Sequence, residues 1–68
     1  MRTIGENIKT RLKAAGRTQA SLSRETKIEA PLIWRYVEKE RAPGVRNLWR
    51  IAKALNCSME DLCEGVFE

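Results

Sequence analysis

Histidine is absent from this sequence, and cysteine and aromatic residues are scarce. None of the 68 residues is histidine, two are cysteine and 6% are aromatic. Because Cys57 and Cys63 have no histidine to join them, neither a Cys/His zinc site nor a Cys-His catalytic pair can be built. The sequence also shows no nucleophile-base pair and no phosphate-binding loop. We therefore expect no metal, no cofactor, no small-molecule ligand and no enzymatic activity, with both thiols reduced and packed as small apolar groups.

Long hydrophobic runs are absent as well. Residues 1–4 lack the apolar run of roughly 7–15 residues that a signal peptide needs, and no stretch approaches the ~20 apolar residues of a membrane-spanning helix. We therefore expect a cytoplasmic protein with no membrane partner. The length predicts a single domain over residues 1–68, whose core is small enough that we expect a second copy to add buried surface.

Charge of one sign is in excess and is unevenly distributed. Residues 1–53 carry all 13 cations and five carboxylates, for a net charge of +8, whereas residues 54–68 carry four carboxylates and no cation. This distribution indicates that the first three quarters of the chain faces a polyanion, while the C-terminal residues point away from it.

Capping residues divide the first half of the chain into three helices. Thr3 and Glu6 form the pattern of a capping box, which predicts a helix from there to a stop at Gly16. Thr18 is a suitable cap for a second helix, over residues 19 to about 26. A third helix is predicted from about residue 29, since a proline at position 31 is tolerated in a first turn. Its apolar residues follow helical spacing: Leu32, Ile33, Tyr36 and Val37.

Two more helices are predicted in the second half of the chain. Residues 39–44 break the periodicity and are predicted as a loop. The next helix starts at about Val45 and has Asn56 as a left-handed C-cap. Ser58 and Asp61 form a second capping pattern, which opens a short helix that stops at Gly65. Because no segment shows a strand signal, we predict an all-α fold of five helices. The fourth helix is expected to be the central element of the core, through Val45, Leu48, Trp49, Ile51, Ala52 and Leu55.

The segment from about residue 18 to residue 37 is the most informative part of the sequence. Two short helices meet there across a turn of about three residues, with small residues where they cross. An angled pair of this kind lets the second helix enter a DNA major groove about 12 Å wide, while the first crosses the phosphate backbone. The segment therefore predicts a helix-turn-helix.

From about Ile4 to Gly65 the sequence resembles the Xre/Cro family of phage and bacterial repressors. The resemblance rests on strings that occur in order, at residues 4–8, 16–22 and 51–62, together with Ile33, Tyr36, Pro43 and Leu48. It implies a compact, lambda-repressor-like domain whose second and third helices form the helix-turn-helix, with a C-terminal helix and tail over about 58–68. It also implies a sequence-specific transcription regulator, and best a Cro-like repressor that binds a palindromic operator in double-stranded DNA as a homodimer.

Three positions depart from the family pattern. The family usually has Gly in the turn where this chain has Lys27, Glu in place of Val37, and often Gly in place of Lys39. Two alternatives follow for the turn: Lys27 is left-handed, at a cost of about 1 kcal/mol, or the turn is reshaped. A third helix about one turn longer, running toward Glu40, is also compatible with the sequence.

Position by position, the resemblance implies a set of DNA contacts. Arg17 is expected at a phosphate, and Gln19 at a phosphate or a base edge. Arg35 is the best candidate for reading a base, because its guanidinium can pair with O6 and N7 of guanine and discriminate by about 1–3 kcal/mol. The positions facing the groove floor are Ala30, Pro31, Trp34 and Arg35. Backbone contacts are expected from Lys39, Arg41, Arg46 and Asn47.

Plainer alternatives stand beside these assignments. Arg35 can be a solvated surface arginine, Trp34 can fold back onto the domain, and the loop cations Lys39 and Arg41 can be ordinary solvated charge. A protein-interaction module of the same fold, an antitoxin or an adaptor, is the alternative function, because an exposed Trp34 beside Pro31 suits an apolar protein groove as well as DNA. Binding to DNA should weaken steeply with salt, whereas an apolar protein contact should not.

The dimer surface is expected in the C-terminal third of the chain. Trp49 is interpreted as a core or dimer residue, and the acidic end beyond it carries further apolar groups. The residues predicted at the dimer contact are Trp49, Leu62, Val66 and Phe67.

Overall fold

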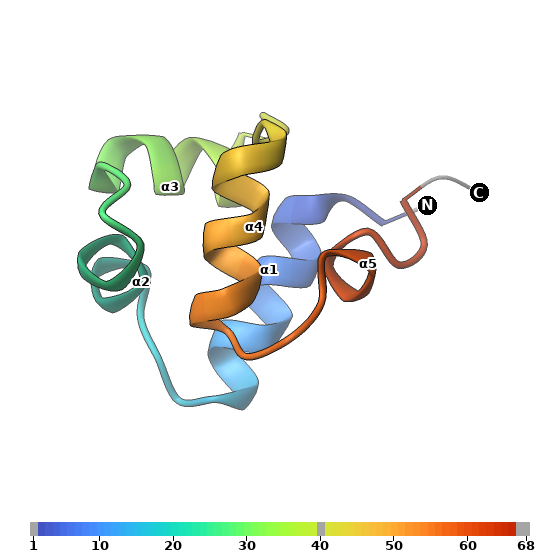
Figure 1. The fold of residues 1–68 in the computed structure, drawn as a ribbon, viewed down its shortest axis with the longest axis horizontal. Coiled ribbons are helices and arrows are strands. Elements are labelled where there is room, and N and C mark those ends of the chain that lie inside the picture. The colour runs from blue at the N-terminus through green and yellow to red at the C-terminus, as the bar shows by residue number, and fades with distance from the viewer. Residues whose placement is uncertain (1, 40, 67–68) are drawn as a thin grey trace.

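The computed structural model describes residues 2–39 and 41–66. The regular secondary structure of these residues consists of helices. Within that part of the chain five helices follow one another: α1 (Ile4–Ala14), α2 (Gln19–Thr26), α3 (Ala30–Glu38), α4 (Val45–Ala54) and α5 (Met59–Leu62). Along the longest axis, α2 lies toward one end and α5 toward the other, with α1 and α4 between them and α3 across one edge (Figure 1). The predicted all-α fold is confirmed.

Local hydrogen bonds start the helices where the sequence predicted. The hydroxyl of Thr3 accepts from the Glu6 N–H at 3.0 Å, and the Glu6 carboxylate accepts from the Thr3 N–H at 3.0 Å. Ser58 and Asp61 make the same reciprocal pair, also at 3.0 Å. These two capping boxes satisfy amides that have no partner inside α1 and α5, so both helix starts are confirmed.

Left-handed residues end two of the helices and close the turn of the helix-turn-helix. Lys27 has φ 63° and Asn56 has φ 57°, and Gly16 has φ 65°. The first alternative for the turn is therefore correct, since Lys27 occupies the left-handed position where the family usually has Gly. The longer third helix is not found, because α3 ends at Glu38 and Lys39 is its non-helical C-cap. Glu40 lies outside the described residues.

One side chain from each helix is completely buried in a shared core. These are Ile8, Leu22, Ile33, Ile51 and Leu62, each at most 1% exposed. Within this core α3 packs on α1 and α2, α4 packs on α2 and α5, and α5 also packs on α1. Leu62 was predicted at a dimer surface, and that prediction is wrong, because its side chain is enclosed by the chain's own helices.

The fourth helix buries a narrower stripe than the sequence predicted. Leu48, Ile51 and Ala52 are buried, but Val45 is 77% exposed and Trp49 is 51% exposed. Val45 and Trp49 lie one turn apart on a helix, so they share an edge of the apolar stripe. That edge turns away from the core, and the prediction that these two residues belong to it is corrected.

Two polar or close contacts hold α1 against the helices beside it. A Cβ added at Gly5 would overlap the carbonyl oxygen of Tyr36, so the absence of a side chain lets α1 approach the end of α3. The buried amide of Asn7 donates to the carbonyls of Leu62 at 2.8 Å and Glu64 at 2.9 Å.

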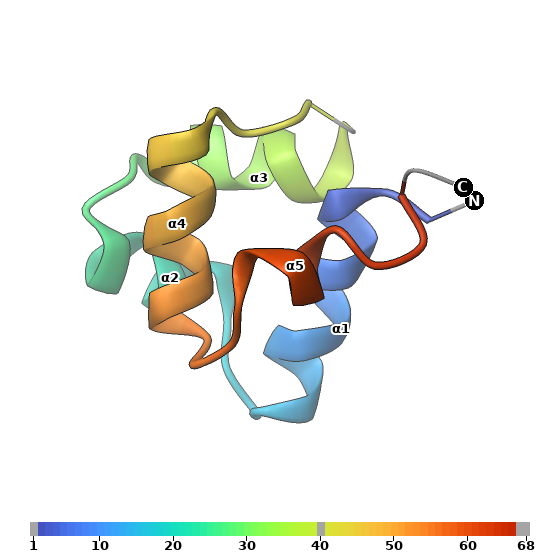
Figure 2. The same cartoon turned by 45° about the vertical axis from the view of Figure 1, so that its right-hand side comes forward.

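The Arg2 N–H donates to the Gly65 carbonyl at 3.0 Å, so the segments next to the two termini lie side by side (Figure 2). No helix among residues 2–39 and 41–66 is long and apolar enough to cross a membrane.

Candidate nucleic-acid interface

The third helix presents one face to the core and the other to solvent. Ile33, Tyr36 and Val37 are buried. The outward positions recur one turn apart, which places them along one continuous strip of the helix surface. This strip consists of Ala30, Pro31, Trp34, Arg35 and Glu38, all exposed. The structure therefore brings together the four residues predicted to face the groove floor.

Side-chain hydroxyls fix the angle at which α3 leaves α2. Thr26 donates to the Leu22 carbonyl at 2.7 Å and accepts from the Ile28 N–H at 3.3 Å. Ser23 donates to the carbonyl of Ile28, whose side chain is buried between the two helices. The sequence predicted this turn but not the hydrogen bonds that the two hydroxyl groups make. The available signal was a Ser and a Thr in the last turn of α2. Because the turn is tied at these points, the outer strip of α3 is held in a fixed orientation.

Two further contacts anchor the C-terminal half of α3. The Asn47 amide donates to the Tyr36 hydroxyl at 2.9 Å, which joins α3 to α4. The Lys9 ammonium lies 3.4 Å from the Glu38 carboxylate, which joins α3 to α1. Asn47 was predicted at a phosphate, but it is half-buried and its amide serves this internal contact. The sequence analysis did not predict the contact between Lys9 and Glu38, and it assigned Asn47 to DNA.

Arg35 and Trp34 differ in what surrounds them on the outer strip. No carboxylate among residues 2–39 and 41–66 forms an ion pair with Arg35, and its side chain is exposed. Trp34 is 46% exposed, and the Lys39 ammonium stands 5.3 Å from the centre of its ring. The indole therefore does not fold back into the core, and a cation lies directly over it.

The remaining predicted cations of this region lie on segments that flank α3. Lys39 and Arg41 are exposed around the end of α3, and Arg46 is exposed in the first turn of α4. Gln19, the first residue of α2, is half-buried. Lys39, Arg41 and Arg46 are thus exposed and Gln19 is partly so, as a backbone contact requires.

Arg17 does not have the position that the sequence predicted for it. Its guanidinium donates to the Ala54 carbonyl at 2.6 Å and lies 2.9 Å from the Glu25 carboxylate, with only 24% of the side chain exposed. A guanidinium held by two internal partners is not a free phosphate ligand. The prediction of a phosphate contact is corrected, because Arg17 braces α2 against the end of α4.

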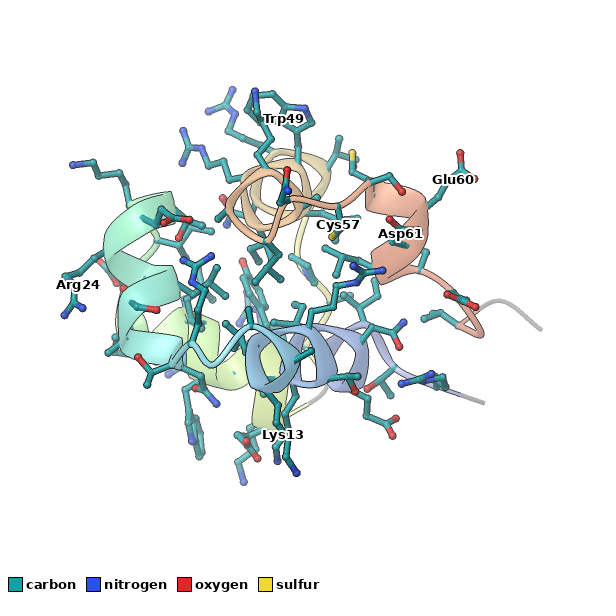
Figure 3. All side chains as sticks on the ribbon, turned by 90° about the horizontal axis from the view of Figure 1, so that it is seen from below. Lys13, Arg24, Trp49, Cys57, Glu60 and Asp61 are labelled. Atoms are coloured by element: carbon teal, nitrogen blue, oxygen red, sulfur yellow. The ribbon has the colours of Figure 1, made fainter. Side chains whose placement is uncertain are left out.

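A basic edge on α1 was missed as part of this surface. Lys9 reaches α3 through Glu38, and Lys13 lies one turn further along the same side of α1. Figure 3 shows Lys13 projecting from the face opposite to that of Trp49. The signal in the sequence was the spacing of four residues between the two lysines. Only the packing of α1 on α3 shows that this edge lies beside α3.

At the C-terminal end of the described residues, hydrogen bonds and burial shift the pKa values of Asp61 and Cys57, and the exposure of the predicted dimer residues differs. Hydrogen bonds from the backbone and side chain of Ser58 hold the pKa of Asp61 below its usual value. Burial raises the pKa of the Cys57 thiol, and Cys57 and Cys63 are both half-buried and unpaired with each other. Of the predicted dimer residues, Trp49 is exposed and Val66 is half-buried, while Phe67 lies outside the described residues.

Comparison with known proteins gives one match. A family model described as helix-turn-helix matches residues 8–62, which spans the interface described above. No curated protein and no solved structure matches the chain significantly. The matched residues therefore include all of α2, the turn and α3.

Proposed function

Because the chain belongs to the Xre/Cro-type helix-turn-helix family and is a DNA-binding transcription regulator of that kind, we propose that it is a Cro-like repressor acting in the cytoplasm. In this proposal α3 enters the major groove of a palindromic operator, and two copies bind as a homodimer. The observation that carries the proposal is the outer strip of α3. It presents an exposed Arg35, which pairs with no carboxylate of the described residues, beside an exposed Trp34, on a helix that is anchored to α1, α2 and α4.

Each exposed residue has a distinct role in the proposed complex. Arg35 reads a guanine edge, because its guanidinium supplies paired donors to O6 and N7. Ala30 and Pro31 offer only apolar contact, for example to a thymine methyl group. Trp34 covers sugar or a methyl group beside them. Phosphate contacts come from Gln19, Lys39, Arg41 and Arg46, which are accessible around the strip.

Dimerisation is proposed on grounds of size and spacing. Half-sites of such operators are about 34 Å apart, one turn of DNA. The longest extent of one protomer is 31 Å, so two copies side by side match this spacing. Of the apolar residues predicted at the contact, Val66 remains accessible on the acidic end and Leu62 does not. We propose that the contact lies at this end, and deletion of residues 66–68 should shift a sedimentation profile toward monomer.

Selection of bound sequences from random duplex DNA tests the proposed function directly. The expected result is a palindrome whose half-sites are about one helical turn apart. Recovery of a single half-site, or of direct repeats, would contradict the symmetric dimer. Recovery of no sequence preference would contradict base reading by Arg35.

A protein-interaction module is the second candidate function, and one observation favours it. Trp34 is an apolar ring that is 46% exposed on the outer strip of α3. Salt separates the two candidates, since DNA binding loses orders of magnitude of affinity between low and moderate salt, whereas burial of an indole in a protein groove does not. Binding that is insensitive to salt would replace the repressor by the interaction module.

A further inference from the structure

A groove lies between the end of α2 and the exposed side of α4. It has a volume of about 400 Å³ and is lined by residues 25–27 and by Trp49, Arg50, Lys53 and Ala54. Trp49 is 51% exposed, and the Lys53 ammonium stands 4.8 Å from the centre of its ring. An exposed indole on a folded chain of this size is a large apolar surface left uncovered.

The charges around this groove are almost all positive. Lys27, Arg50 and Lys53 line it and are exposed. The one carboxylate in the lining, on Glu25, already pairs with Arg17 at 2.9 Å. The groove therefore combines an apolar ring with three cations that no carboxylate of the lining compensates.

This groove does not belong to the surface proposed for DNA. Trp49 projects from the face opposite to that of Lys13 (Figure 3). Lys13 shares its side of α1 with Lys9, which contacts Glu38 on the outer strip of α3. A duplex held against α3 therefore leaves the groove beside Trp49 uncovered.

We propose that this groove docks an acidic, amphipathic segment of a partner protein. Carboxylates of the segment pair with Arg50 and Lys53, and an apolar side chain covers Trp49, as in helix-in-groove recognition. A two-fold contact between copies at this site would set Arg50 and Lys53 against themselves, which is repulsive. A duplex bound by α3 lies away from the face that carries Trp49 and leaves this indole uncovered. Trp49 is thereby assigned to a partner other than a second copy related by a two-fold axis at this groove.

Binding of a synthetic peptide to the full chain tests this assignment. The probe has Leu on one helical face and Glu on the other, carries a fluorescent label and contains no Trp. Saturable binding is expected by anisotropy, with a shift in Trp49 emission when Trp34→Phe removes the other indole. Charge reversal by Arg50→Glu together with Lys53→Glu should weaken binding at least about tenfold. Reversal of one charge on the opposite face, by Lys13→Glu, should leave the peptide affinity unchanged, and so it serves as the control for each single reversal, Arg50→Glu or Lys53→Glu, which should weaken binding.

Three further measurements decide between the possible occupants. The wild-type chain saturated with a short duplex at low salt should bind the peptide as tightly as the free chain does. Displacement of the peptide by duplex would overturn the proposal and make the groove a nucleic-acid site. Self-association that the double charge reversal abolishes would overturn it in favour of a second copy. Equal affinity for polyglutamate, which has no apolar side chain, would also overturn it. Arg50→Gln with Lys53→Gln, checked for an unchanged thermal midpoint, repeats the test with a milder change.

Discussion

Trp34 and Trp49 are nearly identical in their local surroundings but lie on surfaces of different kinds. Their rings are 46% and 51% exposed, and each has a lysine ammonium above it, at 5.3 Å from Lys39 and 4.8 Å from Lys53. Trp34 stands on a helix whose outer strip meets solvent along its length. Trp49 stands beside a groove whose other wall is the end of α2. The same pair of residue types therefore forms part of a convex surface in one case and of a concave one in the other.

This difference teaches that an exposed aromatic with a cation above it does not by itself indicate a function. A convex helix can enter a DNA groove, which is itself concave and polyanionic. A groove on the protein requires a convex partner that brings its own apolar group. The two surfaces are thus distinguished by shape, and the changes that follow should separate them.

The largest expected effect comes from Leu62→Ala, which should disturb both surfaces together. Leu62 is completely buried where α5 meets α1 and α4. Loss of a buried leucine side chain costs about 2–5 kcal/mol of unfolding free energy. Urea unfolding followed by circular dichroism measures it, with Val66→Ala at a less buried position as the control. Unchanged stability with lost dimerisation would return Leu62 to a dimer surface.

Replacing one arginine on each surface should separate the two. Arg35→Ala should lose about 1–3 kcal/mol of affinity for the selected operator, because two acceptors of one guanine are no longer read. It should keep most non-specific affinity and tolerate substitution at one base pair per half-site. Arg50→Ala is the matched control and should bind DNA as wild type does, apart from a small change in salt dependence. Titration of every single-base operator variant makes the measurement. A uniform loss, with no position relaxed, would place Arg35 on phosphate.

Arg41 and Arg17 were both predicted at phosphates, and the structure separates them. Arg41→Ala should reduce the slope of log affinity against log salt by about one unit, since one phosphate contact is lost. Arg17→Ala should leave that slope unchanged and lower the thermal midpoint, because Arg17 joins Ala54 and Glu25 inside the fold. Affinity measured over a series of salt concentrations, with melting curves for both variants, tests the pair. A reduced slope for Arg17→Ala would restore its phosphate contact.

The smallest expected effect is a pH dependence at the start of α5, outside both surfaces. Hydrogen bonds from Ser58 hold the pKa of Asp61 below its usual value. The stabilisation is therefore fully present above the pKa of an unfolded aspartate, about 3.9, and is lost as the pH falls through the lower value in the folded chain. The protection of the amides of residues 58–62, which is their exchange rate compared with the intrinsic rate at each pH, should fall over that acidic range in wild type. Asp61→Asn should remove this step, and a step that persists in the variant would assign it to another group.

Short-range features of the fold could be predicted because their causes are local. The capping boxes at Thr3 and Ser58 satisfy amides within three residues, so residue identity and spacing suffice to place them. The left-handed Lys27 was one of two alternatives that the sequence left open for the turn, and the structure decided between them. The outer strip of α3 was also predictable, since the spacing of Ile33, Tyr36 and Val37 sets which face is buried and hence which side Arg35 occupies.

Long-range contacts corrected the other assignments. Trp49 and Leu62 both follow apolar helical patterns, but one lies at the edge of its stripe and the other at its centre, which depends on where neighbouring helices pack. The sequence likewise gives no measure of how close the Arg17 guanidinium comes to a carbonyl 37 residues away.

The sequence by itself determined the helices, their caps, the helix-turn-helix and the family, because these depend on hydrogen bonds and periodicities that span a few residues. The tertiary structure alone decided which cations are exposed and which are held inside the fold, as Arg35 and Arg17 show. It also decided that Trp34 and Trp49 belong to different surfaces. The physical reason is that burial, ion pairing and concavity arise where helices distant in the chain meet, and the geometry of that meeting is set by the packing of the whole core.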